Sequence, residues 1–545
     1  MKQLKKSVAI AGLALAVLFG VTACGGNAGD SSAAGSGQSR QETDVLGGRD
    51  AAGGAGNAGG QGAVDGAANA SADAAGADSA GASTARDWND GAVHITTSDD
   101  LAAFAEQVNA GETALTAVLE NDIDMSGICG ASAGNFEPIQ EFEGEFDGNG
   151  HVIENLYCVQ EGSAMLFSSL SGTVKNLRLE NAVMESEEGS AAGIAGSLHG
   201  RIENCSVSGS ITAYKYAGGI AVDLYRDSSV ADCVSEAQVS GGYFDEDKRG
   251  LRGAAAGIAA WPREGGTITG CINRGSVSGN GNMAAGIAGH CENGRILIEN
   301  CVNEGEIRGR SGVAQLGSWG QNENYVGGIA GYAGENTAIA ACVNKGNVFG
   351  TGLVGGIAGA SGNFIINCAN HGDLEAAEGG KVYGIASLAV NGLLNCYNTG
   401  DITGDRLACG IGSSSKAVTI NLYNYGTITC TDGDGVLTDA FPWSSGGAAT
   451  GLLNTYSREN CIVAPDGGSG SVSVQAGNAV PEEQFTDGTI LAALNTAAAD
   501  INSGADMGFG GLEDYVRAVM EYEYFDASLS QWKAGTDGLP CFEWE

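Results

Sequence analysis

The feature that most constrains the fold is a motif that recurs through the middle of the chain. Each copy begins with a Gly-Ile pair, and successive pairs lie 26 to 42 residues apart. The motif glycines are Gly193, Gly219, Gly257, Gly286, Gly328, Gly356, Gly384 and Gly410. Internal repeats of this length predict an elongated protein in which each repeat packs mainly against its neighbours.

Three further positions recur inside each repeat. A cysteine follows the motif glycine after 12 to 15 residues in every copy except the last, which has Leu422. These cysteines are Cys205, Cys233, Cys271, Cys301, Cys342, Cys368 and Cys396. Two residues later, six copies have asparagine, namely Asn273, Asn303, Asn344, Asn370, Asn398 and Asn424, and a glycine usually follows two residues after that.

Short apolar runs separated by glycine and asparagine predict strands and turns instead of helices. A set of such short strands cannot bury its apolar face alone, whereas stacked coils about 4.7–4.9 Å apart share one core. We therefore predict an all-β fold: a parallel β-solenoid of the right-handed β-helix type, with a short N-terminal capping helix and a C-terminal cap.

The cysteine position is predicted to point into the core, because Leu422 replaces it once. Buried free thiols explain the column best, since cysteine behaves as a small apolar residue. Disulfides between coils and a metal site are the alternatives, but the coil spacing is too long for a disulfide and no CxxC pair exists. We expect no metal and no cofactor.

The asparagine two residues after each cysteine is interpreted as a turn residue in the left-handed conformation, with its amide stacked from coil to coil. A ladder of asparagines that binds a ligand is the alternative. The following glycine then supplies a positive φ or a close backbone approach. Ile339 and Cys342 are three residues apart, so a bend between them is needed if both point inward.

The N-terminus has the features of an exported lipoprotein. A basic start precedes an apolar run from Val8 to Phe19, and Val-Thr-Ala leads into Cys24, which we predict to carry the lipid. The predicted segments are a lipoprotein signal peptide (1–23), the lipidated cysteine with a disordered Gly/Ala/Ser tether (24–86), an N-terminal cap with the first coils (87–182), the repeats (183–460) and a C-terminal capping region (461–545).

The net charge of −39 argues against nucleic acid as a partner, because such a surface repels phosphates. We expect contact with the membrane to come from the N-terminal lipid alone. The predicted location is the bacterial cell envelope, with the chain lipid-anchored on the extracellular side of the membrane.

The repeat resembles the GLUG-motif family of bacterial surface proteins. The two halves of the family motif are seen in Gly327-Gly328-Ile329-Ala330-Gly331 and in Ile365-Ile366-Asn367-Cys368-Ala369-Asn370-His371-Gly372. The resemblance covers roughly residues 93–455 and implies a surface, adhesin-like protein. Some immunoglobulin A peptidases carry the repeat beside a zinc peptidase domain, but this chain has five histidines and no HExxH motif, so that activity is not carried over.

A second block supports the same resemblance. Residues 142–156 resemble the segment that opens such solenoids, and its Asp147-Gly-Asn149-Gly predicts a turn, with calcium binding as the alternative. Upstream, residues 99–108 show helical spacing of Leu101, Phe104, Ala105 and Val108 and are expected to cap the first coil.

Candidate ligand-binding residues lie in insertions between the repeats. The spacing from the repeat's second glycine, or its equivalent, to the next Gly-Ile is usually 10–12 residues, but rises to 20, 23 and 25 at three places. We expect all three insertions at one edge of the solenoid. The candidate ligand-binding residues, which suit stacking and hydrogen bonding to sugars or a protein, are Tyr243, Asp245, Asp247, Arg249, Arg308, Arg310 and Trp319.

The leading interpretation is an adhesin-like binding module for a glycan or a host or cell-surface protein. A carbohydrate-active enzyme, of the polysaccharide lyase or glycosidase type, with its site on the edge that carries the insertions is one alternative, and a structural stalk without ligand is another. No pair of carboxylates stands out among 65 acidic residues, so no catalytic residue is assigned. The helical spacing over 487–501 and the final residues are expected to block the edge of the last coil.

Overall fold

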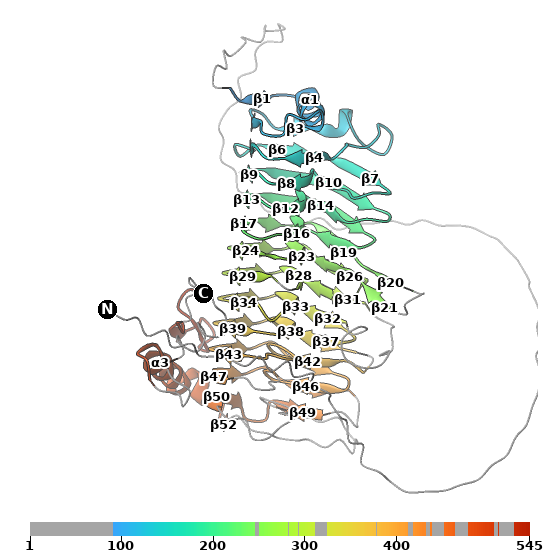
Figure 1. Cartoon of the computed structure of the whole chain (residues 1–545). Helices are drawn as coiled ribbons and strands as arrows, with labels where there is room; N and C mark the ends of the chain where they lie inside the picture. Colours follow the sequence, from blue (N-terminus) through green and yellow to red (C-terminus); the bar gives the residue numbers. More distant parts are fainter. Residues whose placement is uncertain are drawn as a thin grey trace, which may run out of the picture. The chain divides into compact units, whose positions relative to one another are not determined.

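A computed structural model describes residues 91–245, 250–281, 283–292, 294–310, 324–377, 379–412, 418–431, 436–438, 452–463, 478–505, 511 and 528–545. The predicted signal peptide, Cys24 and tether lie outside these residues. The described chain is almost entirely strand and forms a parallel β-solenoid, as predicted, whose coils stack from β1 to β52 (Figure 1). No helix of the described residues is long and apolar enough to cross a membrane.

Each typical coil contains a first strand, a short second strand and a third strand that belong to one large sheet, followed by one strand in each of two smaller sheets. The first strands are β1 (Val93–Ile95), β2 (Thr116–Leu119), β5 (Glu145–Asp147), β9 (Thr173–Lys175), β13 (Arg201–Glu203), β17 (Ser229–Ala231), β24 (Gly265–Thr269), β29 (Arg295–Glu299), β34 (Thr337–Ala340), β39 (Phe364–Ile366), β43 (Gly392–Leu394), β47 (Val418–Asn424) and β50 (Leu452–Arg458). In β47 and β50 the first and second strands are continuous.

The remaining strands of the large sheet follow the same order. The second strands are β3 (Ile123–Asp124), β6 (Val152–Glu154), β18 (Val234–Ser235), β25 (Ile272–Asn273), β30 (Val302–Asn303), β35 (Val343–Asn344), β40 (Ala369–Asn370), β44 (Tyr397–Asn398) and β52 (Asn478–Val480). The third strands are β7 (Tyr157–Gln160), β19 (Gln238–Gly241), β26 (Val277–Gly279), β31 (Ile307–Gly309), β36 (Val348–Gly350), β41 (Leu374–Ala376), β45 (Ile402–Gly404), β48 (Ile428–Cys430) and β51 (Ile462–Val463). In β10 (Arg178–Ser186) and β14 (Ser206–Ala213) the second and third strands are continuous.

Two smaller parallel sheets complete the coils. The nine-stranded sheet contains β11 (Ala191–Ala192), β15 (Tyr216–Gly218), β22 (Ala254–Ala256), β27 (Met283–Ala285), β32 (Tyr325–Gly327), β37 (Leu353–Gly355), β42 (Lys381–Tyr383), β46 (Leu407–Cys409) and β49 (Val436–Thr438). The eight-stranded sheet contains β4 (Ile139–Phe142), β8 (Phe167–Leu170), β12 (Ala195–Leu198), β16 (Ala221–Leu224), β23 (Ala259–Pro262), β28 (Ala288–Cys291), β33 (Ala330–Ala333) and β38 (Ala358–Ser361).

A residue with positive φ lies between the first and second strands of most coils and makes the predicted bend. Ala341 has φ of 49°, so that Ile339 and Cys342 on either side are both fully buried in the common core. The equivalent residue of other coils is usually the asparagine just before the cysteine, at φ of 51° to 61° in Asn204, Asn300, Asn367, Asn395 and Asn421. Asparagine tolerates this conformation better than other residues with a Cβ.

The asparagine two residues after the cysteine was therefore misassigned. Asn273, Asn303, Asn344, Asn370, Asn398 and Asn424 lie in strands, and all are fully buried. Their amides form the predicted coil-to-coil ladder: Asn344 Nδ2 donates to Asn370 Oδ1 at 2.7 Å and to the Gly346 carbonyl at 2.8 Å, while Asn344 Oδ1 accepts from Asn303 Nδ2 at 2.7 Å. The left-handed conformation belongs instead to the asparagine just before the cysteine, because the chain bends at that residue.

The motif glycine is required by this ladder. A Cβ built on Gly328 would lie 2.2 Å from the side-chain carbon Cγ of Asn344, and one on Gly286 would lie 2.4 Å from that of Asn303. The glycine after each ladder asparagine is equally constrained, since a Cβ on Gly346 would lie 1.9 Å from the Gly305 carbonyl oxygen. Glycine and asparagine recur together because each ladder amide occupies the space that a side chain on the motif glycine would need.

We predict that Asn344→Ala lowers the free energy of unfolding by about 2–4 kcal/mol, because the substitution removes three buried hydrogen bonds and takes one partner each from Asn303 Nδ2 and Asn370 Oδ1. Chemical denaturation measures the change. Asn300→Ala is the matched control, because Asn300 is exposed and Ala341 already occupies the equivalent position one coil later. An equal loss in both variants would contradict a special role for the buried ladder.

The cysteines of the repeat column are free thiols, as predicted. Of the cysteines in the described residues, all but the half-buried Cys541 are buried, and none forms a disulfide. Burial raises the pKa of Cys291 to about 12 and that of Cys158 to about 11. Because thiolate is the reactive form, these thiols are chemically quiet inside the folded core.

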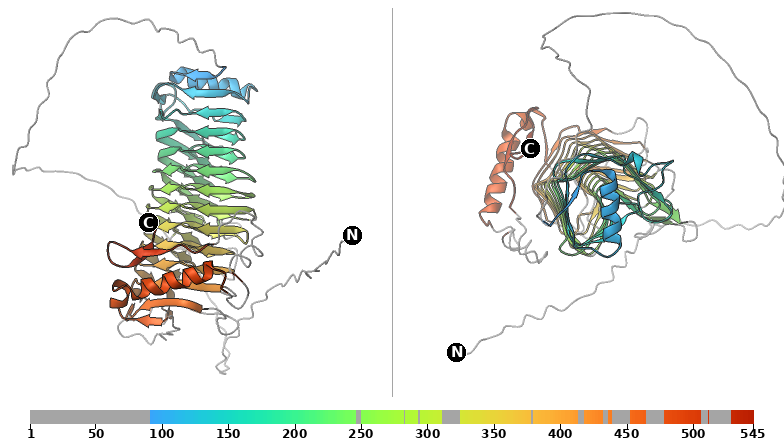
Figure 2. Two further views of the ribbon diagram at one scale, coloured as in Figure 1. Left: turned by 90° about the vertical axis from the view of Figure 1, so that its left-hand side faces the viewer. Right: turned by 90° about the horizontal axis from the view of Figure 1, so that it is seen from above.

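The N-terminal helix closes the first coils. Helix α1 (Ser98–Asn109) begins at Thr97, whose hydroxyl accepts from the Asp100 N–H while the Asp100 carboxylate accepts from the Thr97 N–H, a capping box. Its buried face is the one predicted from sequence. The Phe104 ring lies 5.7 Å from the rings of both Phe142 and Phe146, so the helix covers the end of the core (Figure 2). A 3-10 turn, η1, spans Met125–Gly127.

The C-terminal region packs against the side of the last coils, although we expected it at their end (Figure 2). It contains α2 (Glu483–Thr486), α3 (Thr489–Asn502) and an antiparallel hairpin of β53 (Trp532–Ala534) and β54 (Pro540–Phe542). Apolar residues on the outer side of β34, β39, β43 and β47 explain this position: Ala338, Phe364, Ile366, Leu394 and Ile420 pack with Ala498, Ile501 and Leu529.

Candidate functional site

A groove with a volume of about 890 Å³ crosses five consecutive coils at the end of the third strands. Its lining residues are Gly242, Tyr243, Ser278, Gly279, Asn280, Arg308, Gly309, Arg310, Phe349, Gly350, Thr351, Glu375 and Ala377. They come from β26, β31, β36 and β41 and from the short segments that follow the third strands. The groove therefore lies at the junction where the first two insertions leave the solenoid.

The repeat places one outward side chain of each coil in register along the groove. Ser278 pairs with Arg308, Arg308 with Phe349, and Phe349 with Glu375 in successive parallel strands. Glycine follows the first three of these residues, so the floor beside them is backbone. The column thus presents a hydroxyl, a guanidinium, an aromatic ring and a carboxylate at one coil spacing each.

Arg308 is held by its two neighbours. Its guanidinium carbon lies 4.3 Å from the centre of the Phe349 ring, and its Nε donates to the Glu306 carboxylate. The Glu306 carboxylate, and more weakly Glu375, raise the pKa of Arg308, so the side chain stays charged. The terminal Nη atoms make no hydrogen bond or ion pair to other residues that the structure describes.

Arg310 is held through both its backbone and its side chain. Its carbonyl accepts hydrogen bonds from Thr351 Oγ1 at 2.9 Å and from Asn324 Nδ2 at 3.2 Å. Its side-chain Nη1 donates to the Asn280 carbonyl at 3.3 Å. Two neighbouring coils therefore position this residue beside Arg308.

An aromatic pair closes one end of the groove. Tyr243 begins the hairpin of β20 (Tyr243–Asp245) and β21 (Gly250–Arg252), which projects from the stack (Figure 1). Its ring stacks on Tyr214 at 4.2 Å between centroids and 17° between planes. Tyr214 is 44% exposed, which is unusual for a large aromatic residue in the described part of this chain.

The structure brings together three of the seven predicted binding residues, Tyr243, Arg308 and Arg310. Asp245 lies in β20, but its side chain, together with Asp247, Arg249 and Trp319, is outside what the structure describes. The prediction omitted Phe349, which lines the groove beside Arg308. The repeat contained the missing signal, because Phe349 and Arg308 occupy the same position one coil apart.

The prediction that the third insertion lies at the same edge as the first two was only partly correct. Strand β49 pairs with β46, so it occupies the ordinary place in the nine-stranded sheet, and only 431–435 separate it from β48. Most of the extra length, 439–451, follows β49 and precedes β50, at a different junction from the groove. The structure of 439–451 is outside the described residues.

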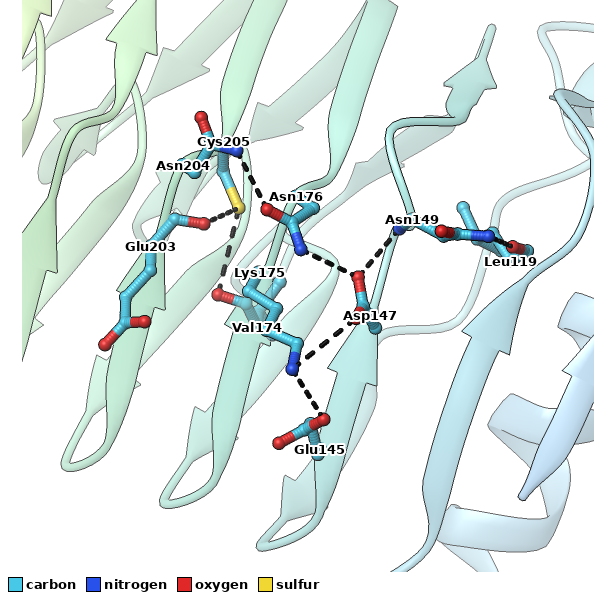
Figure 3. A network of polar contacts seen from close by, with 10 residues as sticks. All are labelled: Leu119, Glu145, Asp147, Asn149, Val174, Lys175, Asn176, Glu203, Asn204 and Cys205. Carbon is cyan, nitrogen blue, oxygen red and sulfur yellow. Dashed lines mark hydrogen bonds and ion pairs between the residues drawn. The ribbon is translucent and has the colours of Figure 1, made fainter. Parts of the chain in front are cut away.

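The predicted turn at Asp147 has its own polar partners (Figure 3). Asp147 Oδ1 accepts from the Asn149 N–H at 2.8 Å and from Asn176 Nδ2 at 3.0 Å, while Oδ2 lies 3.5 Å from Lys175 Nζ. These contacts explain the acidic residue without a cation. In the described chain no group of three or more His, Cys, Asp or Glu residues is placed to hold a metal ion.

A second polar cluster lies on the outer side of the eight-stranded sheet. Arg263 stacks on Trp261, with its guanidinium carbon 3.7 Å from the ring centre, and Tyr216 stacks on the same indole at 4.4 Å. Arg263 Nη2 lies 3.5 Å from Asp223 Oδ2. Asp223 Oδ1, Trp261 Nε1 and Arg263 Nε are each buried without a hydrogen-bond partner. Because these atoms are out of reach of a ligand, we interpret the cluster as packing.

Burial raises the pKa of Asp223 to about 6, although Arg263 acts in the opposite direction. The folded chain therefore holds the Asp223 proton more tightly than the unfolded chain does. The protonated Asp223 side chain stabilises the fold fully below about pH 4, and this stabilisation is lost as the pH rises through about 6. For a pKa shift of this size the stabilisation is at most about 3 kcal/mol.

We predict that Asp223→Asn raises the thermal unfolding midpoint at pH 7.5, because it removes a buried charge, and has little effect at pH 4. Circular dichroism melts at both pH values measure the difference. Asp227→Asn is the control, since Asp227 is exposed in the same coil and its φ of 65° suits asparagine. A gain that is the same at both pH values would contradict the assigned cause.

The comparisons with known proteins are distant or short. No family model matches the chain. Over 90 residues it is 37% identical to Halomucin of Haloquadratum walsbyi, a stretch that covers 15% of this chain and spans about 1% of the length of Halomucin. It is similar to a candidate immunoglobulin A1 protease from Bacteroides ovatus, with 18% identity, 83% of this chain and 92% of that chain covered, and a TM-score of 0.28.

A further similarity is to the solved structure of an IgA1 protease, with 13% identity and a TM-score of 0.24, covering 67% of this chain and 21% of the other. These matches are too distant or too short to assign an activity to the chain.

Proposed function

We propose that this chain is a lipid-anchored, adhesin-like surface protein of a bacterial envelope, of the GLUG-motif type, and that its groove binds a glycan. The observation that supports this most is the position of Tyr243, Arg308 and Arg310, which come from two different coils and line one groove. Exposed aromatic rings beside hydrogen-bonding side chains are typical of sugar-binding surfaces.

The composition of the lining favours binding over catalysis. Glu375 is the one carboxylate among the lining residues of the groove. Glycoside hydrolysis usually needs two carboxyl groups about 5–9.5 Å apart on either side of the scissile bond. A binding role needs no such pair. The elongated scaffold suits it too, because backbone hydrogen bonds from coil to coil hold the groove residues in place.

We predict that the full chain, purified in detergent, binds a subset of a glycan array, and that Tyr243→Ala weakens this binding at least tenfold. The expected loss comes from the stacking surface that Tyr243 offers at the end of the groove. Trp544→Ala is the control, because Trp544 is also 44% exposed but belongs to the C-terminal region.

Binding that Tyr243→Ala and Trp544→Ala reduce equally would place the ligand elsewhere on the chain. Binding only to a host or cell-surface protein would favour the protein-ligand interpretation. No binding across a broad array would favour a structural stalk, and release of product from a polysaccharide would favour an enzyme.

The lipid anchor has a separate test. We predict that Cys24→Ser moves the chain from the membrane fraction to the soluble fraction of the producing bacterium, because the thiol of Cys24 carries the lipid in this proposal. Cys541→Ser is the control and is expected to stay with the membrane. A wild-type chain that is already soluble would disprove anchoring but would leave the proposal for the groove intact.

A further inference from the structure

The groove differs in charge from the rest of the chain. The sequence has 65 acidic residues and only 26 lysines and arginines. The groove lining has two arginines and one carboxylate. Glu306, which contacts Arg308 Nε, brings the local balance to two arginines and two carboxylates, so an acidic ligand is repelled less at the groove than elsewhere on this acidic chain.

We infer that the ligand of this groove is an oligosaccharide that carries carboxylate or sulfate groups, an inference that rests on the proposed glycan binding. Arg308 is the centre of the inference. Phe349 supports one face of its guanidinium and Glu306 occupies Nε, so the two Nη atoms remain for an oxyanion. A guanidinium held in one plane recognises carboxylate or sulfate oxygens with two parallel hydrogen bonds.

The lining favours a sugar over a peptide. A peptide commonly binds by adding a strand to a sheet edge or by inserting apolar anchors into pockets. The groove crosses strands β26, β31, β36 and β41, whose backbones already pair with one another, so these four strands offer no free edge to a peptide. Apart from Tyr243, its apolar side chains are Phe349 and Ala377, whereas Ser278, Asn280 and Thr351 add polar groups.

The length of the groove favours several sugar units. Its lining spans five coils from Tyr243 to Ala377, and four spacings of 4.7–4.9 Å give roughly 19 Å. Tyr243 at one end offers an aromatic surface, and Arg308 and Arg310 lie near the middle. Glu375 lies toward the other end, where it would repel a further acidic unit. The charged group of the ligand therefore belongs over the two arginines.

Titration calorimetry on the full chain in detergent tests this inference with four probes. They are a galacturonate pentasaccharide, its neutral methyl ester, a sulfated heparin hexasaccharide and a hexaglutamate peptide. We expect one or both acidic sugars to bind at least tenfold more tightly than the methyl ester, and hexaglutamate to bind more weakly than the better acidic sugar. The better acidic probe shows whether carboxylate or sulfate is preferred.

Three variants locate the effect. Arg308→Gln is expected to remove most of the preference for the acidic sugar, whereas Glu375→Gln should tighten its binding several-fold by removing a repulsive charge. Arg274→Gln is the matched control, because Arg274 is similarly exposed and lies between Glu236 and Glu304, outside the groove. Circular dichroism confirms that each variant is folded.

Several results would overturn the inference: equal binding of acid and ester, no binding of either acidic sugar, unchanged binding in Arg308→Gln, or hexaglutamate binding as tightly as the sugars. A failure of the acidic-ligand inference can be distinguished from a failure of the proposed glycan binding. If neutral glycans bind and Tyr243→Ala abolishes that binding, only the acidic class is wrong. If no glycan binds on the array, glycan binding itself is wrong.

Discussion

The stacking of one coil on the next, by parallel backbone hydrogen bonds, is the interaction on which the rest of this structure depends. A strand of two or three residues has no stability alone, so each coil is ordered by its neighbours. The bend at the left-handed residue lets Ile339 and Cys342 face the same core. The buried amide of Asn344 then joins its coil to the coils on both sides. Any change that breaks this register moves every side chain above and below it.

The groove is a product of the same stacking. No single repeat contains it, because Ser278, Arg308, Phe349 and Glu375 come from four successive coils. Each side chain is held at one coil spacing from the next by backbone pairing, not by a flexible loop. Such a rigid row loses little conformational entropy when a ligand binds, which is the general advantage of a preorganised site. The first insertion adds to the end of this row, where Tyr243 stacks on Tyr214.

Residues that repeat were predictable, and residues that do not repeat were less so. Leu422 in the cysteine column correctly indicated an apolar interior, and the spacing of Ile339 and Cys342 correctly indicated a bend. The two asparagines around each cysteine were harder to separate, because the same residue type suits a left-handed turn and a buried amide ladder. Arg308 was predicted but Phe349 was not, because the prediction rested on the insertions and not on the outward position that successive coils share. The helix at 489–502 was predictable from its spacing, but its place was not. The helix lies where it does because Phe364 and Leu394, which are far from it in the sequence, offer an apolar surface on the outer side of their coils.

The register of the groove also has a consequence for how such a protein can change over generations. A duplicated or deleted repeat in the region of 278–375 would add or remove one whole coil while the coils on either side keep their pairing. The groove would then become longer or shorter by one step of about 4.8 Å, with one new outward side chain in the row. Under the proposed function, the length and the charge of the ligand would then change through separate genetic events. Recombination between repeats alters the first, and a point substitution at the outward position, such as Arg308, alters the second.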